Sequence, residues 1–169
     1  MEEKIKLNIM VLTISDSRTK ETDKSGNLLT KLINNSNHDV IEHHIVKDNI
    51  YSIRKIISLW IDDSSIDVII STGGTGVTGR DGTPEAIEVL FDKKIDGFGE
   101  IFRYISYKKI KTSTIQSRAT AGVANSTFIF CLPGSPNACK DAWTEIIQYQ
   151  LDSSNKPCNL VELMPKLKD

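Results

Sequence analysis

The stretch Asp67–Ala86, DVIISTGGTGVTGRDGTPEA, joins three patterns that together decide the fold. Residues 67–71 form a short apolar run, which is typical of a strand covered on both faces. A loop rich in glycine and threonine follows, and Pro84 stands where proline favours the first turn of a helix. A strand that leads through a glycine loop into a helix is typical of parallel α/β sheets.

The rest of the chain repeats this alternation on both sides of the quoted stretch. Short apolar runs predict three further strands, at residues 9–14, 40–46 and 127–132. Apolar residues at helical spacing predict helices around residues 28–33, 50–60, 98–110 and 143–147. We therefore expect an α/β fold with a mostly parallel sheet and helices on both of its faces.

The length of 169 residues suits one domain, which we assign to residues 1–169. We expect its core to span about residues 8–152 and residues 153–169 to form a polar tail packed on the surface. Hydrophobic residues make up 39% of the chain and charged residues 25%, as in ordinary globular domains.

Charge and cysteine content narrow the classes of partner and compartment. The net charge of -1 argues against a nucleic-acid partner and favours small molecules or protein surfaces. No apolar segment approaches the roughly 20 residues needed to span a bilayer, so we expect no membrane contact. Three cysteines without a C-x-x-C pair fit a reducing compartment, and the charged N-terminus lacks an apolar signal region. These features predict a cytoplasmic protein.

Four loops leave the carboxyl ends of the predicted parallel strands, where ligands collect in open α/β sheets. They are residues 15–17, 47–49, 72–81 and 133–136. All four can line one rim. Asp48 can also cap the helix that follows it, and Ser15 and Asp16 can cap or touch a nucleotide.

Two nucleotide-binding motifs nearly fit the glycine loop, and both fail. Gly74–Gly79 spells G-x-G-x-x-G, but the next helix starts near Pro84, five residues beyond Gly79, which is too late for a dinucleotide fingerprint. A triphosphate-binding P-loop needs a lysine and a hydroxyl where this chain has Arg80 and Asp81.

The physics that the two motifs share still applies to this loop. Gly73, Gly74 and Gly76 allow backbone amides to turn together into an anion-binding nest. Thr72 and Thr75 add hydroxyl donors, and the Pro84 helix adds the positive end of a dipole. An acid beside an anion indicates a cation between them, so Asp81 suggests Mg²⁺ or a group that positions a nucleophile. A plain turn with Asp81 as a helix cap is the alternative.

Several ordered motifs resemble the molybdopterin-binding domain family, over nearly the whole chain from about Asn8 to Asn159. The motifs are TGGTG at 72–76, RDGTPEA at 80–86, GFGEIFR at 97–103, QSRATAG at 116–122, GVAN at 122–125, PGSP at 133–136, and QLD at 150–152 with PCN at 157–159. Several such motifs in order are far more specific than a glycine loop alone.

The resemblance implies a three-layer α/β/α sandwich, a trimeric or hexameric homo-oligomer, and adenylyl transfer. In that reaction the terminal phosphate of molybdopterin attacks the α-phosphorus of ATP and pyrophosphate leaves. Mg²⁺ is the expected cofactor, with ATP and molybdopterin as substrates. Asp48 and Asp81 match the family's two catalytic acids and would hold Mg²⁺ or orient the attacking phosphate.

The predicted binding residues for molybdopterin and nucleotide come from the four loops and from the stretch after residue 116. They are Ser15, Asp16, Thr72, Gly73, Gly74, Thr75, Gly76, Arg80, Ser117, Arg118, Pro133, Gly134 and Ser135. For Arg118, a phosphate and a carboxylate of the fold are both open partners. Arg80 either steers phosphate into the nest or is solvated.

Two other functions remain open at this point. The same fold can serve as a catalytically silent oligomer that binds or carries molybdopterin, or as a scaffold for other cofactor enzymes. The intact run from Arg80 to Ala86 favours an active enzyme.

Overall fold

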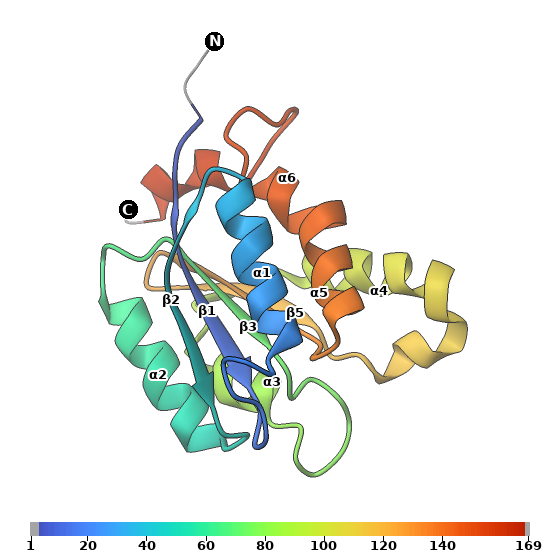
Figure 1. The fold of residues 1–169 in the computed structure, drawn as a ribbon. Helices are drawn as coiled ribbons and strands as arrows, with labels where there is room; N and C mark the ends of the chain where they lie inside the picture. The colour runs from blue at the N-terminus through green and yellow to red at the C-terminus, as the bar shows by residue number, and fades with distance from the viewer. Residues whose placement is uncertain (1–3, 168–169) are drawn as a thin grey trace.

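The computed structural model describes residues 4–167 (Figure 1). Its strands are β1 (Asn8–Ile14), β2 (Asp39–Val46), β3 (Val68–Thr72), β4 (Lys93–Lys94), β5 (Thr120–Ala124) and β6 (Thr127–Leu132). Its α-helices are α1 (Lys24–Asn35), α2 (Ile50–Asp62), α3 (Thr83–Ile87), α4 (Asp96–Ile110), α5 (Pro136–Ala142) and α6 (Gln148–Gln150). Short 3₁₀ turns are η1 (Glu88–Leu90), η2 (Lys111–Gln116) and η4 (Val161–Lys166), and a π-helical turn, η3 (Trp143–Ile147), joins α5 to α6.

The six strands form one sheet in the order β2-β1-β3-β6-β5-β4. β2, β1, β3 and β6 run parallel, whereas β5 runs antiparallel to both β6 and β4. The strands that carry the predicted rim are therefore the four parallel ones, and their carboxyl ends share one edge.

Helices cover both faces of the sheet, which confirms the three-layer α/β/α prediction (Figure 1). On one face Leu29 of α1, Phe102 of α4 and Trp143 of η3 pack into a buried cluster against β1 and β6. On the other face Ile53 and Ile57 of α2 pack with α3 against the same strands. This double burial explains why β1 and β3 are continuous apolar runs rather than alternating ones.

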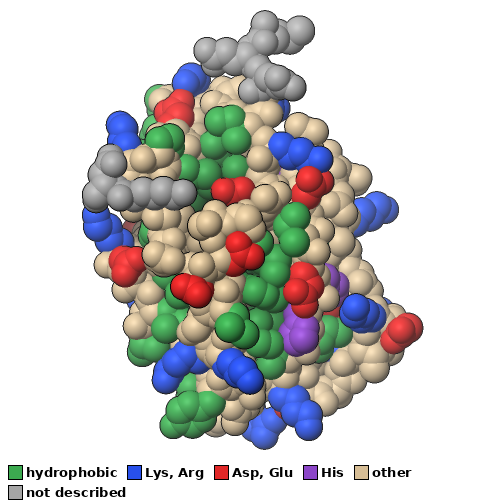
Figure 2. All heavy atoms as spheres, turned by 90° about the vertical axis from the view of Figure 1, so that its left-hand side faces the viewer, with side chains coloured by type: hydrophobic (Ala, Val, Ile, Leu, Met, Phe, Trp, Pro, Cys, Tyr) green, Lys and Arg blue, Asp and Glu red, His purple; other side chains and the backbone are tan. Residues whose placement is uncertain are grey.

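β2 is one of the two edge strands of the sheet, with β4 at the other edge, and it lies on the side of the molecule that Figure 2 shows. Basic and acidic side chains are interspersed on this face, with hydrophobic side chains between them. The β1–β2 register shifts beside Ile9, so that β2 carries one extra residue at this point. A bulge and charged side chains such as Glu42 are features that discourage edge-to-edge pairing of strands.

Two parts of the fold differ from the sequence-based expectation. The hairpin of β5 and β6, with the two-residue β4 beside it, adds an antiparallel edge that the sequence analysis did not include. The segment after Ser153 is also more than a surface tail, because Val161 is only 3% exposed and belongs to the core cluster beneath α5. Within residues 4–167 no helix is long and apolar enough to cross a membrane.

Candidate functional site

The four predicted loops meet at the carboxyl ends of the parallel strands. The Ser15 amide donates to the Val46 carbonyl at 2.9 Å, and the Asp48 amide donates to Asp16 Oδ1 at 3.3 Å. The Gly73 amide donates to the Leu132 carbonyl at 3.0 Å. These contacts tie the ends of β1, β2, β3 and β6 into one rim.

The backbone carbonyls of residues 73–76 all point into the protein. The Thr83 hydroxyl donates to the Gly73 carbonyl at 2.8 Å, and the Thr83 amide donates to that of Gly74 at 3.0 Å. The Arg118 amide donates to the Thr75 carbonyl at 3.0 Å, and Arg118 Nε donates to that of Gly76 at 2.7 Å. With these four successive carbonyls bonded to protein donors, only the amides of the loop remain as backbone groups that a ligand could bind.

Only part of the predicted amide nest is free to receive an anion. The Gly73 amide is bonded to β6, and the Gly76 amide donates to the Asp81 carboxylate. The amides of Gly74 and Thr75 have no acceptor within residues 4–167. Gly73 and Gly74 adopt φ values of 108° and 64°, which a residue with a side chain rarely accepts, so the glycines are needed for this turn.

Asp81 is fixed as a carboxylate by its own loop. Thr78 donates to Asp81 Oδ2 from both its hydroxyl, at 2.5 Å, and its amide, at 2.9 Å. The hydrogen bond from the Thr78 hydroxyl is the main reason why the pKa of Asp81 lies below its ordinary value. Asp81 does not cap α3, because Gly82 stands at the cap position. Since α3 has only five residues, its dipole is a small contribution to the site.

Asp48 has the opposite electrostatic environment. Partial burial raises its pKa, and the nearby charges of Asp81 and Asp16 raise it further, while the Gly82 amide and Arg80 oppose the shift. Asp48 is not the cap of α2, since Asn49 Oδ1 accepts from the Ser52 amide at 3.0 Å. The Asp48 carboxylate is therefore left facing the glycine loop, within about 3.0 Å of the place a Gly74 Cβ would take.

The predicted Mg²⁺ ligands fit a metal that is shared with a substrate. The described residues contain no group of three His, Cys, Asp or Glu side chains that could hold a metal by themselves. Mg²⁺ is commonly held by one or two carboxylates together with substrate phosphates and water. Asp48 and Asp81, whose charges repel each other beside free amides, match that smaller ligand set.

The two arginines of the predicted site are both paired with carboxylates. Arg118 forms an ion pair with Glu85 and also donates from Nη2 to the Asp81 carbonyl at 2.6 Å. Arg80 pairs with Asp16, and its side chain is 69% exposed. Of the two partners left open for Arg118, the structure shows the carboxylate.

Two pockets share Gly74 and Gly134 in their walls. The first, of about 390 Å³, lies between the glycine loop, α4, η2 and the Pro133–Ser135 turn, and its far wall includes Phe102 and Ile110. The second, of about 310 Å³, lies between the glycine loop and the start of α1. It carries the cationic side chains of Arg18 and Lys24 and several hydroxyl groups.

The other predicted binding residues lie at this site with local structural partners. The Thr72 hydroxyl is buried and donates to the Pro133 carbonyl at 2.9 Å. Ser135 Oγ caps α5 by accepting from the Ala138 amide at 3.2 Å, and Ser15 Oγ accepts from the Arg18 amide at 3.2 Å. Ser117 borders the first pocket, and Gly134 approaches Gly73 closely enough that an added Cβ would lie 3.4 Å from the Gly73 Cα.

Sequence reasoning missed the outer walls of both pockets. It assigned no role to Ser106, Thr114, Arg18, Lys24 or Ser25. The positions of these residues depend on how α1, α4 and η2 pack beside the glycine loop, and no local motif marks them.

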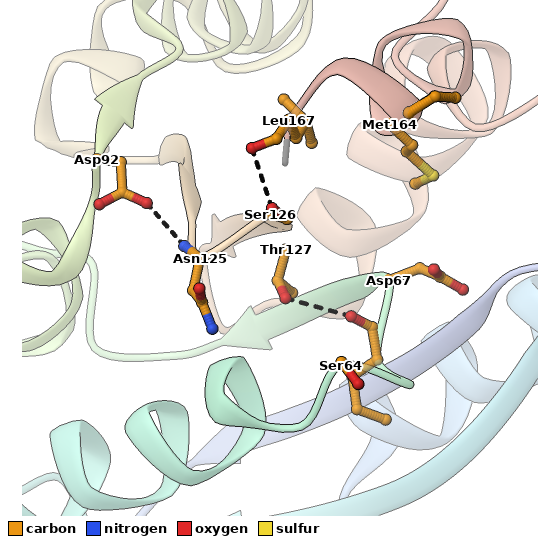
Figure 3. Close-up of a pocket in the computed structure, with 10 residues that line it drawn as sticks. Ser64, Asp67, Asp92, Asn125, Ser126, Thr127, Met164 and Leu167 are labelled. Atoms are coloured by element: carbon orange, nitrogen blue, oxygen red, sulfur yellow. Dashed lines mark hydrogen bonds between the residues drawn. The ribbon is translucent and has the colours of Figure 1, made fainter. Parts of the chain in front are cut away.

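A larger hollow of about 660 Å³ lies at the opposite end of the sheet (Figure 3). Asp67 and Thr127, at the beginnings of β3 and β6, line it together with the β5–β6 turn and Met164. Asn125 in that turn donates its amide to Asp92 at 2.7 Å, and Ser126 donates its hydroxyl to the Leu167 carbonyl at 3.1 Å (Figure 3). Within residues 4–167, the lining of this hollow contains no Lys, Arg or His side chain, so the glycine loop end is the better candidate for phosphate groups.

Comparison with known proteins gives consistent matches over most of the chain. A family model described as "Probable molybdopterin binding domain" matches residues 10–153. Molybdenum cofactor biosynthesis protein B of Escherichia coli (strain K12) is 48% identical over 155 residues, covering 92% of this chain and 91% of that protein. A crystal structure of a molybdenum cofactor biosynthesis protein B superposes with a TM-score of 0.88 at 38% identity, covering 98% of both chains. The tungsten cofactor synthesizing protein MoaB of Pyrococcus furiosus superposes with a TM-score of 0.77 at 33% identity, covering 97% of this chain and 98% of that one.

Proposed function

This chain belongs to the molybdopterin-binding family of molybdenum cofactor biosynthesis proteins, and from that premise we propose that it adenylylates molybdopterin with Mg-ATP. The observation that carries the proposal is the pair of free amides at Gly74 and Thr75 beside two carboxylates of unequal pKa. Phosphoryl-type transfer requires mainly alignment of the reactants and neutralisation of their charge.

The two pockets on either side of Gly74 suit two different ligands. The pocket beside α4 has an apolar wall at Phe102 and Ile110, which suits a flat pterin ring. The pocket beside α1 carries Arg18 and Lys24, which suit the phosphates of a nucleotide. Because both pockets border Gly74, ligands bound in them would bring their phosphates together at the free amides.

In the proposed reaction an oxygen of the molybdopterin phosphate forms a bond to the α-phosphorus of ATP. The bond from that phosphorus to the bridging oxygen breaks, and pyrophosphate leaves with the electron pair. The Gly74 and Thr75 amides hold the phosphate oxygens on which charge accumulates. Asp81, held ionised by Thr78, and Asp48 would bind the Mg²⁺, which neutralises phosphate charge when it is present.

Removing one carboxylate tests this assignment. Asp81→Asn keeps the shape of the side chain and its contact with Thr78, and we expect AMP transfer to fall by about 10²- to 10³-fold. The assay is pyrophosphate release from Mg-ATP in the presence of molybdopterin. Asp62→Asn, which removes an exposed charge at the end of α2, is the matched control and should retain the full rate. Release of pyrophosphate at the wild-type rate by Asp81→Asn refutes the role of Asp81.

The same assay separates the enzyme from a silent carrier. A carrier binds molybdopterin and releases no pyrophosphate at any ATP concentration, and a scaffold binds neither ligand. An active enzyme releases pyrophosphate only when molybdopterin and Mg²⁺ are both present.

We further expect a homo-oligomer, trimeric or hexameric, as the resemblance implies. Exposed apolar side chains gather on α4 and η2, including Tyr104 at 60% and Ile115 at 79% exposure. An exposed apolar surface of this kind is typical of contacts between protein chains. Light scattering should give three or six times the chain mass of 18.9 kDa, and a mass of one chain contradicts the expectation.

A further inference from the structure

The geometry points to Arg118 as a positioning residue that holds residues 76–81 of the glycine loop, including Asp81, in place, rather than as a ligand of phosphate. This inference rests on the proposed function for its kinetic consequences, although its structural basis stands independently. It concerns a side chain that binds the loop at two separate carbonyls, those of Gly76 and Asp81.

Arg118 contacts the loop through its backbone amide and two of its three guanidinium nitrogens. Its amide donates to the Thr75 carbonyl at 3.0 Å, Nε donates to the Gly76 carbonyl at 2.7 Å, and Nη2 donates to the Asp81 carbonyl at 2.6 Å. Nη1 is taken by Glu85. Each of the three guanidinium nitrogens therefore has a partner in the protein, two on the loop and one on Glu85.

Arg118 orients the part of the loop that follows the free amides, whereas Thr83 orients the free amides of Gly74 and Thr75 themselves. A peptide unit turns its amide and its carbonyl in opposite directions, so a carbonyl fixed inward points the next amide outward. Arg118 fixes the carbonyls of Thr75 and Gly76, and Thr83 fixes those before them. Loss of the guanidinium frees the later half of the loop while leaving the Thr83 contacts in place.

Asp81 is attached to the same system. Its carbonyl is held by Arg118, while its carboxylate accepts from Thr78 and from the Gly76 amide. A shift of the Asp81 backbone therefore moves a proposed Mg²⁺ ligand and the loop together. Displacements of about 1 Å in a catalytic group can cost on the order of 10²-fold in rate.

We use the word clamp for Arg118 together with Glu85. Glu85 binds the guanidinium at Nη1, while Nε and Nη2 bind the loop. The ion pair with Arg118 is the main reason why the pKa of Glu85 lies below its ordinary value. If Arg118 bound phosphate, Glu85 would compete with the ligand, and removing its charge would help binding. If Arg118 is a clamp, removing that charge loosens the guanidinium and harms the site. The two roles thus predict opposite effects for one substitution.

The experiment compares Arg118→Lys, Glu85→Gln and the double variant with wild type. We expect kcat for AMP transfer to fall by about 10- to 100-fold in Arg118→Lys and less in Glu85→Gln, with KM for Mg-ATP within about threefold of wild type. The fall in kcat of the double variant should be smaller than the product of the falls in the two single variants, because Arg118 and Glu85 act through the same ion pair. A raised KM with unchanged kcat in Arg118→Lys, with a lowered KM in Glu85→Gln, overturns the inference.

Hydrogen exchange provides a readout that does not need turnover. The amides of Thr78 and Asp81 are bonded within the part of the loop that Arg118 holds, and we expect them to exchange about tenfold faster in Arg118→Lys. Arg54→Lys is the matched control, since Arg54 also donates to two carbonyls, those of Glu85 and Ala86, but outside the loop. It should leave the exchange of these two amides unchanged.

Unchanged exchange in Arg118→Lys refutes the clamp whether or not the protein transfers AMP. Conversely, absence of pyrophosphate release from wild type refutes the proposed function, while faster loop exchange in Arg118→Lys still supports the clamp. The two failures are therefore distinguishable.

Discussion

Replacing Gly73 by alanine tests the backbone geometry on which the whole site depends. Gly73 has φ of 108°, and a Cβ added there would lie 2.3 Å from the Ile14 carbonyl oxygen. That oxygen belongs to the backbone of β1, which is paired with β2 on one side and β3 on the other, so it cannot move aside as a flexible side chain would. The strain must instead shift the glycine loop.

The expected cost has two parts. A residue with a side chain in a sparsely populated backbone region costs about 1–3 kcal/mol. Forcing an extra carbon into a packed position adds about 1–3 kcal/mol. Gly79 provides the control, because no heavy atom lies within 4 Å of a Cβ there and its φ is not positive. Gly79→Ala should be neutral or stabilise by about 0.4–1 kcal/mol through the unfolded chain.

Urea unfolding at equal protein concentration measures the difference. With a slope of about 2 kcal/mol per molar urea, a gap of at least about 2 kcal/mol places the two midpoints roughly 1 M apart. Gly73→Ala should have the lower midpoint and should also lose affinity for Mg-ATP. Coincident midpoints for the two variants refute the geometry assigned to the loop.

Two further predictions concern stability away from the glycine loop. His38 is buried, and its Nδ1 accepts a hydrogen bond from the Leu7 amide at 3.3 Å. Burial lowers the pKa of His38 from its ordinary value of 6.5. As the pH falls, the imidazole is therefore protonated in the unfolded chain before it is protonated in the folded protein. The free energy of unfolding of the wild-type protein should therefore fall as the pH drops below about 6.5. In His38→Gln, the urea midpoint should depend less on pH over this range. The same pH dependence in wild type and His38→Gln contradicts this prediction. The buried Asp23 carboxylate accepts a hydrogen bond from the Thr13 hydroxyl at 2.5 Å. Asp23→Asn removes its charge and should lower the free energy of unfolding by about 1–3 kcal/mol, measured by thermal unfolding. An unchanged melting temperature shows that this charge does not stabilise the fold.

The sequence was sufficient to predict most of the fold, because burial on both faces leaves a local mark. β1, β3 and β6 are continuous apolar runs, and each lies in the structure where its run predicts it. β5 was missed because its sequence, TAGVA, is short and rich in small residues. Its existence depends on pairing with β6 across a two-residue turn, and β4 in turn depends on β5.

The candidate site was predictable to a similar extent and for a similar reason. Gly73, Gly74 and Asp81 lie within one short loop, so their spacing alone predicts a turn that exposes amides next to an acid. The action of Arg118 was not predictable, because it binds backbone carbonyls more than 30 residues away, and a carbonyl acceptor has no sequence signature. The cap of α2 was not predictable either. Asp48 and Asn49 are neighbours, and both residue types are common helix caps, so the sequence does not show which of them caps α2.

The central claim is that the Gly74 and Thr75 amides receive the phosphates of both substrates. The most direct measurement is the amide resonances of ¹⁵N-labelled protein during titration with Mg-ATP and then molybdopterin. We predict that the Gly74 and Thr75 resonances move with both ligands, while that of Asn125, in the hollow at the other end of the sheet, stays in place. Resonances that move around Asn125 while Gly74 and Thr75 remain unchanged contradict the account.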